Sequence, residues 1–365
     1  MTEATTKTLR FGVLGCGRMG QRRMELLSAH PRTELVCVAD IRPEAAARAA
    51  ANHRCGRRDS VEEMVAGDTL DGIFVSLPNK FHVGPAVAAL EAGIHVFCEK
   101  PLARTPGEAR SVVEAEIASS ATLRVGANLR YFPNVQAAKQ MLEDGAIGKP
   151  LFVRGWIGHE GWNLTESWFI DPDLGGGGTF IDNGVHMCDL VRWLLGEART
   201  VTGRVQTSLW RIDPVEDNGF GIFELESGAT ALLQASWTEW AGYMYMEIYG
   251  AKGFLRIDNR AGKSKLYLGQ TDGNATAVEV PPEKAPSYKV EFDEYVDDLL
   301  RSRPSFPNAF DGLRAVEMAC GVYESARTGL RQEIWGAEHA QLLRAYEEAE
   351  PAGPVSEMAE AGPVR

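Results

Sequence analysis

The segment from Leu9 to Gly20, LRFGVLGCGRMG, joins an apolar strand-like run to a glycine-rich turn and the start of a helix. Gly15, Gly17 and Gly20 have the G-x-G-x-x-G spacing, which allows a tight turn, a close approach of a pyrophosphate, and close packing of helix on strand. The helix N-terminus would present free N–H groups to phosphates. The segment predicts a dinucleotide site; the competing interpretation is a purely structural turn. The residues expected to contact the dinucleotide are Gly15, Gly17, Arg18, Met19 and Gly20.

A carboxylate stands where such a site would hold the adenosine ribose. Twenty residues after Gly20, the apolar run TELVCVAD ends in Asp40. A carboxylate there can accept both ribose hydroxyls and would repel a 2′-phosphate. Arg42 could instead pair with a 2′-phosphate, which keeps NADP as the alternative. The sequence therefore favours NAD, with Asp40, Ile41 and Arg42 bordering the ribose.

The net charge limits the partners. The 365 residues include 38 basic and 50 acidic side chains, a formal charge of −12, which argues against nucleic acid or an anionic membrane as a ligand. No apolar run approaches the ~20 residues that span a bilayer, and the first ten residues have no apolar signal core. We expect a cytoplasmic protein.

The six cysteines form no C-x-x-C pair, so a disulfide framework is not expected.

The first third of the chain alternates strand and helix patterns, which predicts a parallel, doubly wound Rossmann sheet over residues 1–127. Its strands are nearly continuous apolar runs, as expected for a sheet covered on both faces. The expected strands are 9–14, 34–39, 71–77, 94–98 and 122–127, and the expected helices are 18–29, 43–52, 60–66, 81–92 and 105–119.

Polar residues follow several of these strands. Ligands of such sheets bind where the strands end, so we expect these residues at the cofactor edge. Lys100, which follows an apolar strand and precedes Pro101, could donate a hydrogen bond to a substrate oxygen there and stabilise developing charge. The residues at the strand ends are Ser76, Leu77, Pro78, Asn79 and His82 after one strand, Glu99 and Lys100 after the next, and Asn128 and Arg130 after the last.

From about residue 150 the pattern changes to one helix near 179–195 and several consecutive short strands with tight turns. This predicts an α+β domain over 128–345 with a large open antiparallel sheet. Two later helices, near 289–302 and 309–327, would pack on the body, and 346–365 would be a flexible tail. One helix can cover only one face of the sheet. The other face, predicted to carry Trp237, Trp240, Tyr243, Tyr245 and Tyr249, would then form a homodimer or homotetramer interface.

The segment Gly175 to Leu195, GGGGTFIDNGVHMCDLVRWLL, carries a second polar constellation. Asp182, His186 and Asp189 are four and three residues apart and fall on one side of the predicted helix. They could act jointly on one ligand. With His159 they could also ligate a metal, but no H-E-x-x-H or thiolate set accompanies them, so no metal is expected.

These pieces together resemble the glucose–fructose oxidoreductase / inositol dehydrogenase / rhizopine catabolism (Gfo/Idh/MocA) family. The resemblance rests on the glycine motif, on Glu99-Lys100-Pro101, and on Asp182-x-x-x-His186-x-x-Asp189, and it covers nearly the whole chain. It implies that Lys100 bonds the reacting hydroxyl, His186 accepts its proton and Asp182 orients the group. His159 resembles a substrate-side histidine of inositol dehydrogenases, but Glu160-Gly161-Trp162 replaces their Arg-Asn, which points away from myo-inositol.

The expected activity is NAD-dependent hydride transfer from a secondary hydroxyl of a sugar, cyclitol or aminosugar/aminoglycoside-type ring. Glu160, Glu166 and Asp189 could pair with substrate amines, while Trp162 and Trp168 could stack on a ring or simply pack. Two alternatives remain: an NAD-dependent glycosidase that oxidises transiently, and a non-catalytic NAD-binding regulatory protein. The residues expected at the substrate are Lys100, Asn128, Arg130, His159, Trp162, Asp182, His186 and Asp189.

Overall fold

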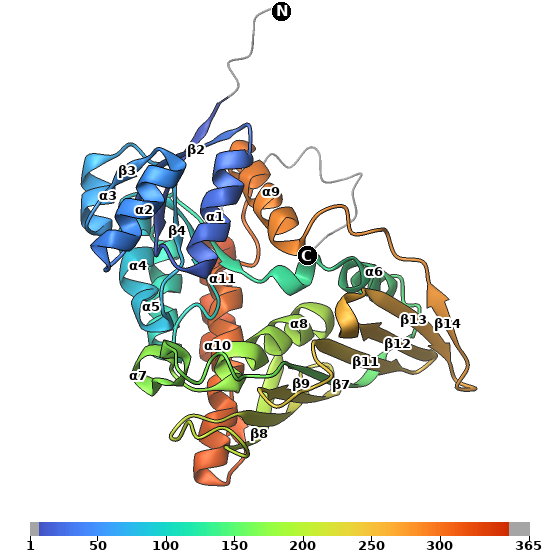
Figure 1. Cartoon of the computed structure of the whole chain (residues 1–365). Helices are drawn as coiled ribbons and strands as arrows, with labels where there is room; N and C mark the ends of the chain where they lie inside the picture. Colours follow the sequence, from blue (N-terminus) through green and yellow to red (C-terminus); the bar gives the residue numbers. More distant parts are fainter. Residues whose placement is uncertain (1–6, 350–365) are drawn as a thin grey trace, which may run out of the picture.

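A computed structural model describes residues 7–349 (Figure 1). Its N-terminal part is a sheet of six parallel strands in the order β3-β2-β1-β4-β5-β6, which confirms the predicted doubly wound sheet. The short strand β3 was not predicted. The strands are β1 (Leu9–Leu14), β2 (Thr33–Ala39), β3 (Gly56–Arg57), β4 (Gly72–Val75), β5 (His95–Glu99) and β6 (Leu123–Gly126).

Helices cover both faces of this sheet. Helices α1 and α2 pack with α9 (Ser287–Leu300) on one face, and α3, α4 and α5 pack with α10 (Ala309–Thr328) and α11 (Ala337–Ala349) on the other. Helix α9 brings Tyr295 against the ring of Phe97, whose centroid is 5.3 Å away, and Phe97 stacks on Phe74. A late segment of the chain thus completes the N-terminal core. The N-terminal helices are α1 (Arg18–Ala29), α2 (Pro43–His53), α3 (Val61–Gly67), α4 (Val83–Glu91) and α5 (Pro106–Ile117).

The two long C-terminal helices join the domains. Helix α10 (Ala309–Thr328) buries Phe310 and Leu313 in the N-terminal core and Val322 in the second core. Helix α9 spans Ser287–Leu300 and α11 spans Ala337–Ala349. The tail predicted from residue 346 was wrong for 346–349, because α11 continues through them and buries Tyr346 in the N-terminal core. The rest of that tail, 350–365, lies outside the described residues.

The second sheet has nine strands in the order β14-β13-β12-β11-β7-β10-β9-β8-β15 and is mostly antiparallel, as predicted. The pair β7–β10 is parallel, because the chain returns to β10 only after α8, β8 and β9, so no tight turn sets their direction. The prediction did not include β14 and β15. The strands are β7 (Pro150–Gly158), β8 (Ala198–Gln206), β9 (Asn218–Leu225), β10 (Thr230–Ser236), β11 (Met244–Gly250), β12 (Gly253–Asp258), β13 (Lys265–Gln270), β14 (Ala275–Val278) and β15 (Gln332–Glu333).

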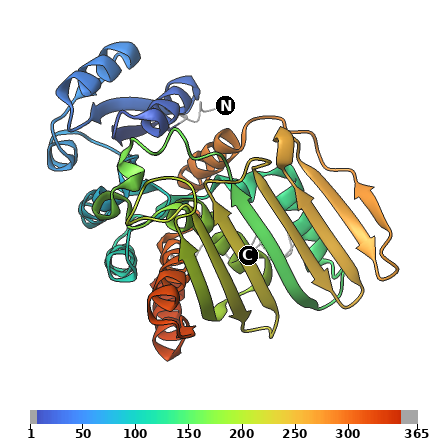
Figure 2. The ribbon, with the colours of Figure 1, turned by 60° about the horizontal axis from the view of Figure 1, so that its bottom comes forward.

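The inner face of this sheet is covered by three helices, α6 (Pro133–Glu143), α8 (Val185–Leu195) and α10. The expectation of a single covering helix was wrong, because it overlooked α6 and placed α10 elsewhere. Figure 2 views the opposite, outer face, on which no helix of the described chain lies. Ile222 and Leu232 are 51% and 45% exposed there.

Only some of the aromatic residues predicted on the outer face lie there. Tyr245 and Tyr249 do lie there, stacked on Trp156 and Phe152 with ring centroids 4.2 and 4.6 Å apart. Trp237 is fully buried beneath neighbouring loops and Tyr243 lines a cleft between the two domains, so the prediction was wrong for these two. Within residues 7–349, no helix is both long enough and apolar enough to cross a membrane.

Candidate functional site

A cleft of about 700 Å³ lies between the two domains, at the carboxyl ends of the parallel strands. Its walls include the glycine turn, the ends of β4 and β5, and the segment that precedes α8. Most of the predicted site residues line it. The predicted residues that do not line it are Gly20, His82, Arg130, Trp162 and Asp189.

The glycine turn has the shape that a diphosphate requires. A Cβ on Gly15, whose φ is +91°, would lie 2.2 Å from the carbonyl oxygen of Ser76, and a Cβ on Gly20 would lie 1.7 Å from that of Gly15. Gly17 has no described atom within 4 Å of such a Cβ, so the backbone there is open to the cleft. Helix α1 begins here without a side-chain cap from the described residues, which leaves its first N–H groups free. Gly20 therefore acts through packing.

The hydroxyl of Ser76 also faces this region. Its Oγ is buried and has no hydrogen-bond partner among residues 7–349, although the residue lines the cleft. A buried polar atom normally has a partner. A ligand that accepts or donates a hydrogen bond at this point would satisfy it, so the residues present fit a bound dinucleotide.

Asp40, predicted to bind the adenosine ribose, lines the cleft. Its Oδ2 accepts a hydrogen bond from the backbone of Cys16 (2.8 Å), and its Oδ1 accepts two from Arg42 (2.9 and 3.2 Å). Burial would raise the pKa of this carboxyl, but the hydrogen bonds from Arg42 and Cys16 outweigh it and lower the pKa overall. Arg42 is thereby engaged by Asp40, and Ile41 between them is 91% exposed. The arrangement favours ribose hydroxyls over a 2′-phosphate.

Lys100 and Asp182, which are 82 residues apart, meet in the cleft. The Nζ of Lys100 donates to both the backbone oxygen and the Oδ1 of Asp182, each at 2.8 Å. The Oδ2 of Asp182 accepts from the indole of Trp237 (3.3 Å). Burial would raise the pKa of Asp182, but the Lys100 ammonium outweighs it, so the pKa is lowered and the carboxylate stays ionised.

Asp182 lies in a single turn of π-helix, η4 (Phe180–Gly184), that leads into α8. A Cβ on Gly184 would lie 2.8 Å from the ring of Phe180, which explains the glycine inside this helix. π-Helical turns inside α-helices are rare and are often found at functional sites.

His186 follows on the first turn of α8 and lines the same cleft. Its imidazole has no hydrogen-bond partner within the described chain. Burial, and then the nearby Lys100 ammonium, lower its pKa to about 3, against the opposing effect of Asp182. The imidazole is therefore neutral near pH 7 and available as a proton acceptor.

His159 comes to the cleft from the end of β7. Its Nδ1 donates to the backbone oxygen of Glu160 (3.0 Å), and its Nε2 accepts from the amide of Asn183 (3.4 Å). Asn128 also lines the cleft, and its amide donates to Ser287 (2.9 Å). These residues add several polar groups to the part of the cleft that holds Lys100 and His186, which we call the substrate end.

Some cleft residues were not predicted. Asn183 had a signal, because it directly follows Asp182, whereas Tyr243 and Tyr288 arrive from distant segments that no local pattern connects to the site. Trp168 lines the cleft and Trp162 is 63% exposed outside it. The placement of Trp162 at the substrate was wrong, because the loop turns its side chain outward.

Arg130 and Asp189 bind each other rather than the cleft. Two guanidinium nitrogens of Arg130 donate to the carboxylate of Asp189 at 2.6 and 2.9 Å, and both residues are buried. Arg130 also lies 3.8 Å from Asp311, which pairs with Arg192. One turn after His186 the helix has passed beneath the cleft, so the substrate role predicted for this pair was wrong.

His82 and Glu99 support the cleft in different ways. His82 is buried, with Nδ1 2.8 Å from the carbonyl oxygen of Pro101 and Nε2 2.8 Å from that of Leu77, so it braces two cleft loops without lining the cleft. Glu99 lines it, but its carboxylate accepts from the buried Arg23 (2.8 Å), which also pairs with Glu291 (2.9 Å). The direct cofactor contact predicted for His82 was wrong.

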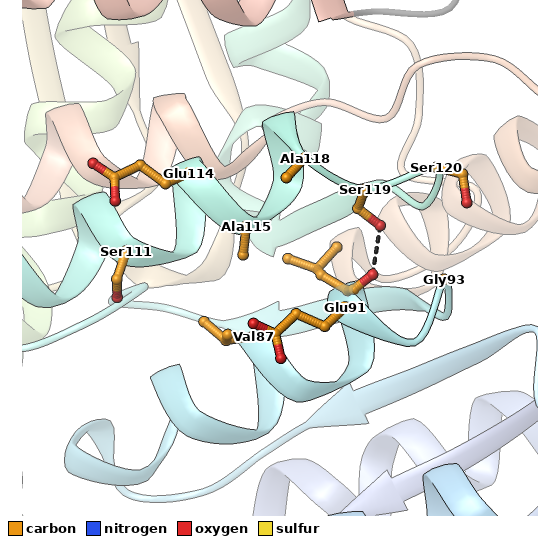
Figure 3. Close-up of a pocket in the computed structure, with 10 residues that line it drawn as sticks. Val87, Glu91, Gly93, Ser111, Glu114, Ala115, Ala118, Ser119 and Ser120 are labelled. Carbon is orange, nitrogen blue, oxygen red and sulfur yellow. Dashed lines mark hydrogen bonds between the residues drawn. The ribbon is translucent and has the colours of Figure 1, made fainter.

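No group of three or more His, Cys, Asp or Glu side chains in the described part of the chain is arranged to hold a metal ion. A second hollow, of about 790 Å³, lies between α4 and α5 (Figure 3). Its labelled side chains include Glu91, Glu114 and three serines, with no cation among them. A dianionic pyrophosphate would not be favoured there, so the interdomain cleft is the better nucleotide site.

Comparisons with known proteins agree with this geometry. Residues 9–127 match the family described as "Oxidoreductase family, NAD-binding Rossmann fold", and residues 135–256 match "GFO/IDH/MocA C-terminal domain". The chain is 28% identical to inositol 2-dehydrogenase 3 of Saccharopolyspora erythraea, over 88% of this chain and 94% of that protein. It is 28% identical to 2,7-anhydro-N-acetylneuraminate hydratase of Escherichia coli, over 72% and 70%. A levoglucosan dehydrogenase solved with NADH and L-sorbose has the same fold, with a TM-score of 0.82, 23% identity, and coverage of 90% and 99%.

Proposed function

The chain belongs to the GFO/IDH/MocA oxidoreductase family, and on that premise we propose that it oxidises a secondary hydroxyl of a sugar or cyclitol with NAD as hydride acceptor. The observation that carries the proposal is the meeting of Lys100, Asp182 and His186 in the cleft that the glycine turn opens into. An ammonium, a carboxylate and a neutral imidazole are the groups that alcohol oxidation needs beside a nicotinamide.

Each group has a defined task in this reaction. Bound NAD supplies the acceptor for the hydride that leaves the carbinol carbon. A nitrogen of His186 takes the hydroxyl proton. The Nζ of Lys100 donates to the reacting oxygen and stabilises the charge that builds there, while Asp182 holds that ammonium in position through the bond at 2.8 Å. His159, Asn128 and Asn183 hold other hydroxyls of the ring.

A sugar or cyclitol is supported by the relatives, among which inositol 2-dehydrogenases recur. Polar groups crowd the substrate end, and Trp168 gives it an apolar surface on which the C–H face of a ring could rest. Aminosugars and aminoglycoside-type rings fall within the same proposal.

The similarity to a hydratase keeps a second candidate, a glycosidase-like reaction that would need NAD as a transient hydride acceptor, so that a group could be eliminated from the oxidised ring before the hydride is returned. The same three residues would serve it. A protein that binds NAD without turnover is disfavoured, because a lysine, an aspartate and an unbonded histidine need not converge in a merely regulatory site.

A panel of sugars, cyclitols and aminosugars, offered with NAD and with NADP, separates these candidates. Accumulation of the reduced nicotinamide supports the dehydrogenase. Cleavage of a glycoside without accumulation supports the transient-oxidation reaction. No turnover with a broad panel, together with retained NAD binding, would support the regulatory alternative.

The outer face of the second sheet suggests how the chain assembles. Ile222 and Leu232 are about half exposed on it, beside the stacked pair Phe152 and Tyr249. An open apolar sheet face is usually covered. A second copy of the chain would cover it, as a homodimer or as half of a homotetramer, and a cytoplasmic location remains a prediction.

A further inference from the structure

We propose that Glu160 makes the substrate end of the cleft selective for rings that carry an ammonium group and against rings that carry a carboxylate. The inference rests on the proposed function and narrows its substrate class. It concerns a residue to which neither the glycine motif nor the Lys100–Asp182–His186 constellation gives a role.

Glu160 is held in place by its backbone. It forms an antiparallel bridge with Thr238, and its carbonyl oxygen accepts from the Nδ1 of His159 at 3.0 Å. The next residue, Gly161, donates to the backbone of Trp237 at 2.9 Å and packs too closely against it to carry a Cβ, which would lie 2.5 Å from that of Trp237. The backbone at Glu160 is therefore fixed before a substrate arrives.

The carboxylate of Glu160 has no ionic or hydrogen-bond partner within residues 7–349. It differs in this from the other carboxylates of the cleft wall. Asp40 is paired with Arg42, Glu99 with Arg23, and Asp182 with Lys100. Glu160 is thus the one cleft carboxylate in the described structure whose charge is not balanced by a neighbouring cation.

The cations that line the cleft do not balance the negative charge of Glu160. Lys100 is already paired with Asp182, and His186 is neutral near pH 7. Arg130, which could have received a carboxylate, is locked onto Asp189 away from the cleft. Arg18 and Arg42 lie with the glycine turn and Asp40, at the nucleotide end.

The substrate end therefore holds one unbalanced negative charge. An ammonium on the ring would pair with Glu160, and a neutral hydroxyl could still donate a hydrogen bond to it. A carboxylate on the ring would meet a like charge and find no free cation. Neutral sugars remain acceptable, amines are preferred, and uronates are rejected.

The test measures how tightly ring compounds bind to the protein–NADH complex. The fluorescence of the bound nicotinamide reports the binding. The probes are D-glucose, its 2-amino and 6-amino derivatives, D-glucuronate, scyllo-inositol and scyllo-inosamine. We expect an amine to bind more tightly than its neutral parent, and glucuronate more weakly than glucose. Glu160→Gln should reduce the amine preference about fivefold, as expected for loss of a partly exposed ion pair, and leave neutral ligands nearly unchanged.

Glu166→Gln is the matched control, because Glu166 is exposed on the same loop but does not line the cleft. It should behave as the unsubstituted protein. Equal binding of amine and parent, tighter binding of glucuronate, no detectable amine binding, or an unchanged preference in Glu160→Gln would each overturn the proposal. Because binding is measured without turnover, an inactive protein that still prefers amines would count against the proposed reaction and not against this inference.

Discussion

The ammonium of Lys100 lies 2.8 Å from both the backbone oxygen and the Oδ1 of Asp182, which ties the end of strand β5 to the π-helical turn before α8. One side chain thereby connects the nucleotide domain to the helix that carries His186. The same ammonium outweighs the effect of burial and keeps Asp182 ionised, and it adds to the burial that lowers the pKa of His186.

The protonation of His186 gives a prediction about pH. Its pKa is lowered to about 3, so the imidazole should stay neutral well below pH 6.5 and kcat/KM should show no inflection there. Lys100→Met removes a charge that lowers this pKa, so the pKa should rise. NMR titration of the imidazole signals, with His186→Asn to assign them, measures both values. A pKa near 6.5 in the unsubstituted protein would show that burial and Lys100 do not lower the pKa of His186, and would contradict the prediction.

Cofactor choice should depend on Asp40. Asp40→Asn removes the anion that opposes a 2′-phosphate and releases Arg42 to bind one. We expect the ratio of kcat/KM for NADP to that for NAD to rise about tenfold, or about 1.4 kcal/mol. Asp59→Asn is a control, since Asp59 also pairs with an arginine on this domain but lies outside the cleft. An unchanged ratio would show that Asp40 does not determine the preference for NAD over NADP.

Glu291 should make the protein less stable as the pH rises. Burial raises its pKa to about 7 in the folded chain, against about 4.5 when unfolded, so the folded state binds a proton more tightly. The free energy of unfolding should therefore fall as the pH rises between these values. Glu291→Gln keeps an acceptor for Arg23 and carries no charge.

Urea unfolding at pH 5 and pH 8 measures the effect. The free energy of unfolding of the variant should equal that of the unsubstituted protein at pH 5. At pH 8 it should be about 1–3 kcal/mol larger. A variant that is less stable at both values would show that the Arg23–Glu291 ion pair outweighs the burial of the carboxylate.

The outer sheet face should hold the oligomer together. Leu232→Arg places a charge at the centre of that face, opposite Ile222 and Arg154 in the strand register. Light scattering should report a smaller assembly, with an unchanged circular dichroism spectrum. Thr202→Arg, two strands away on the outer face, is the comparison variant, and we expect it to reduce the size of the assembly less than Leu232→Arg does. A monomeric mass for the unsubstituted protein would itself refute the assembly proposal.

Much of the nucleotide domain could be predicted, because its strands and helices are marked by local patterns. The apolar run before Gly15, the carboxylate at Asp40 and the lysine before Pro101 each fall where the strand ends require. Helix α6 also had a readable amphipathic pattern, with buried Val135 and Ala138 three residues apart, and was overlooked.

The errors at the site arose where partners come from distant segments. Helical periodicity puts Asp189 on the side of His186, but it cannot show that Arg130, 59 residues earlier, takes up its carboxylate. Nor can it show that Trp237 donates a hydrogen bond to Asp182 or that Tyr288 lines the cleft. Burial of His82 is likewise a property of the packed loops.

The most direct test of the account is Lys100→Ala, measured for turnover of the best sugar or cyclitol substrate and, separately, for NAD binding. Loss of a hydrogen-bond donor to the developing oxyanion should lower kcat/KM by about 10²-fold or more, while the Kd for NAD changes less than about twofold. Lys139→Ala, which breaks an ion pair with Glu143 on α6, is the control. Turnover that persists in Lys100→Ala at the level of this control would contradict the account.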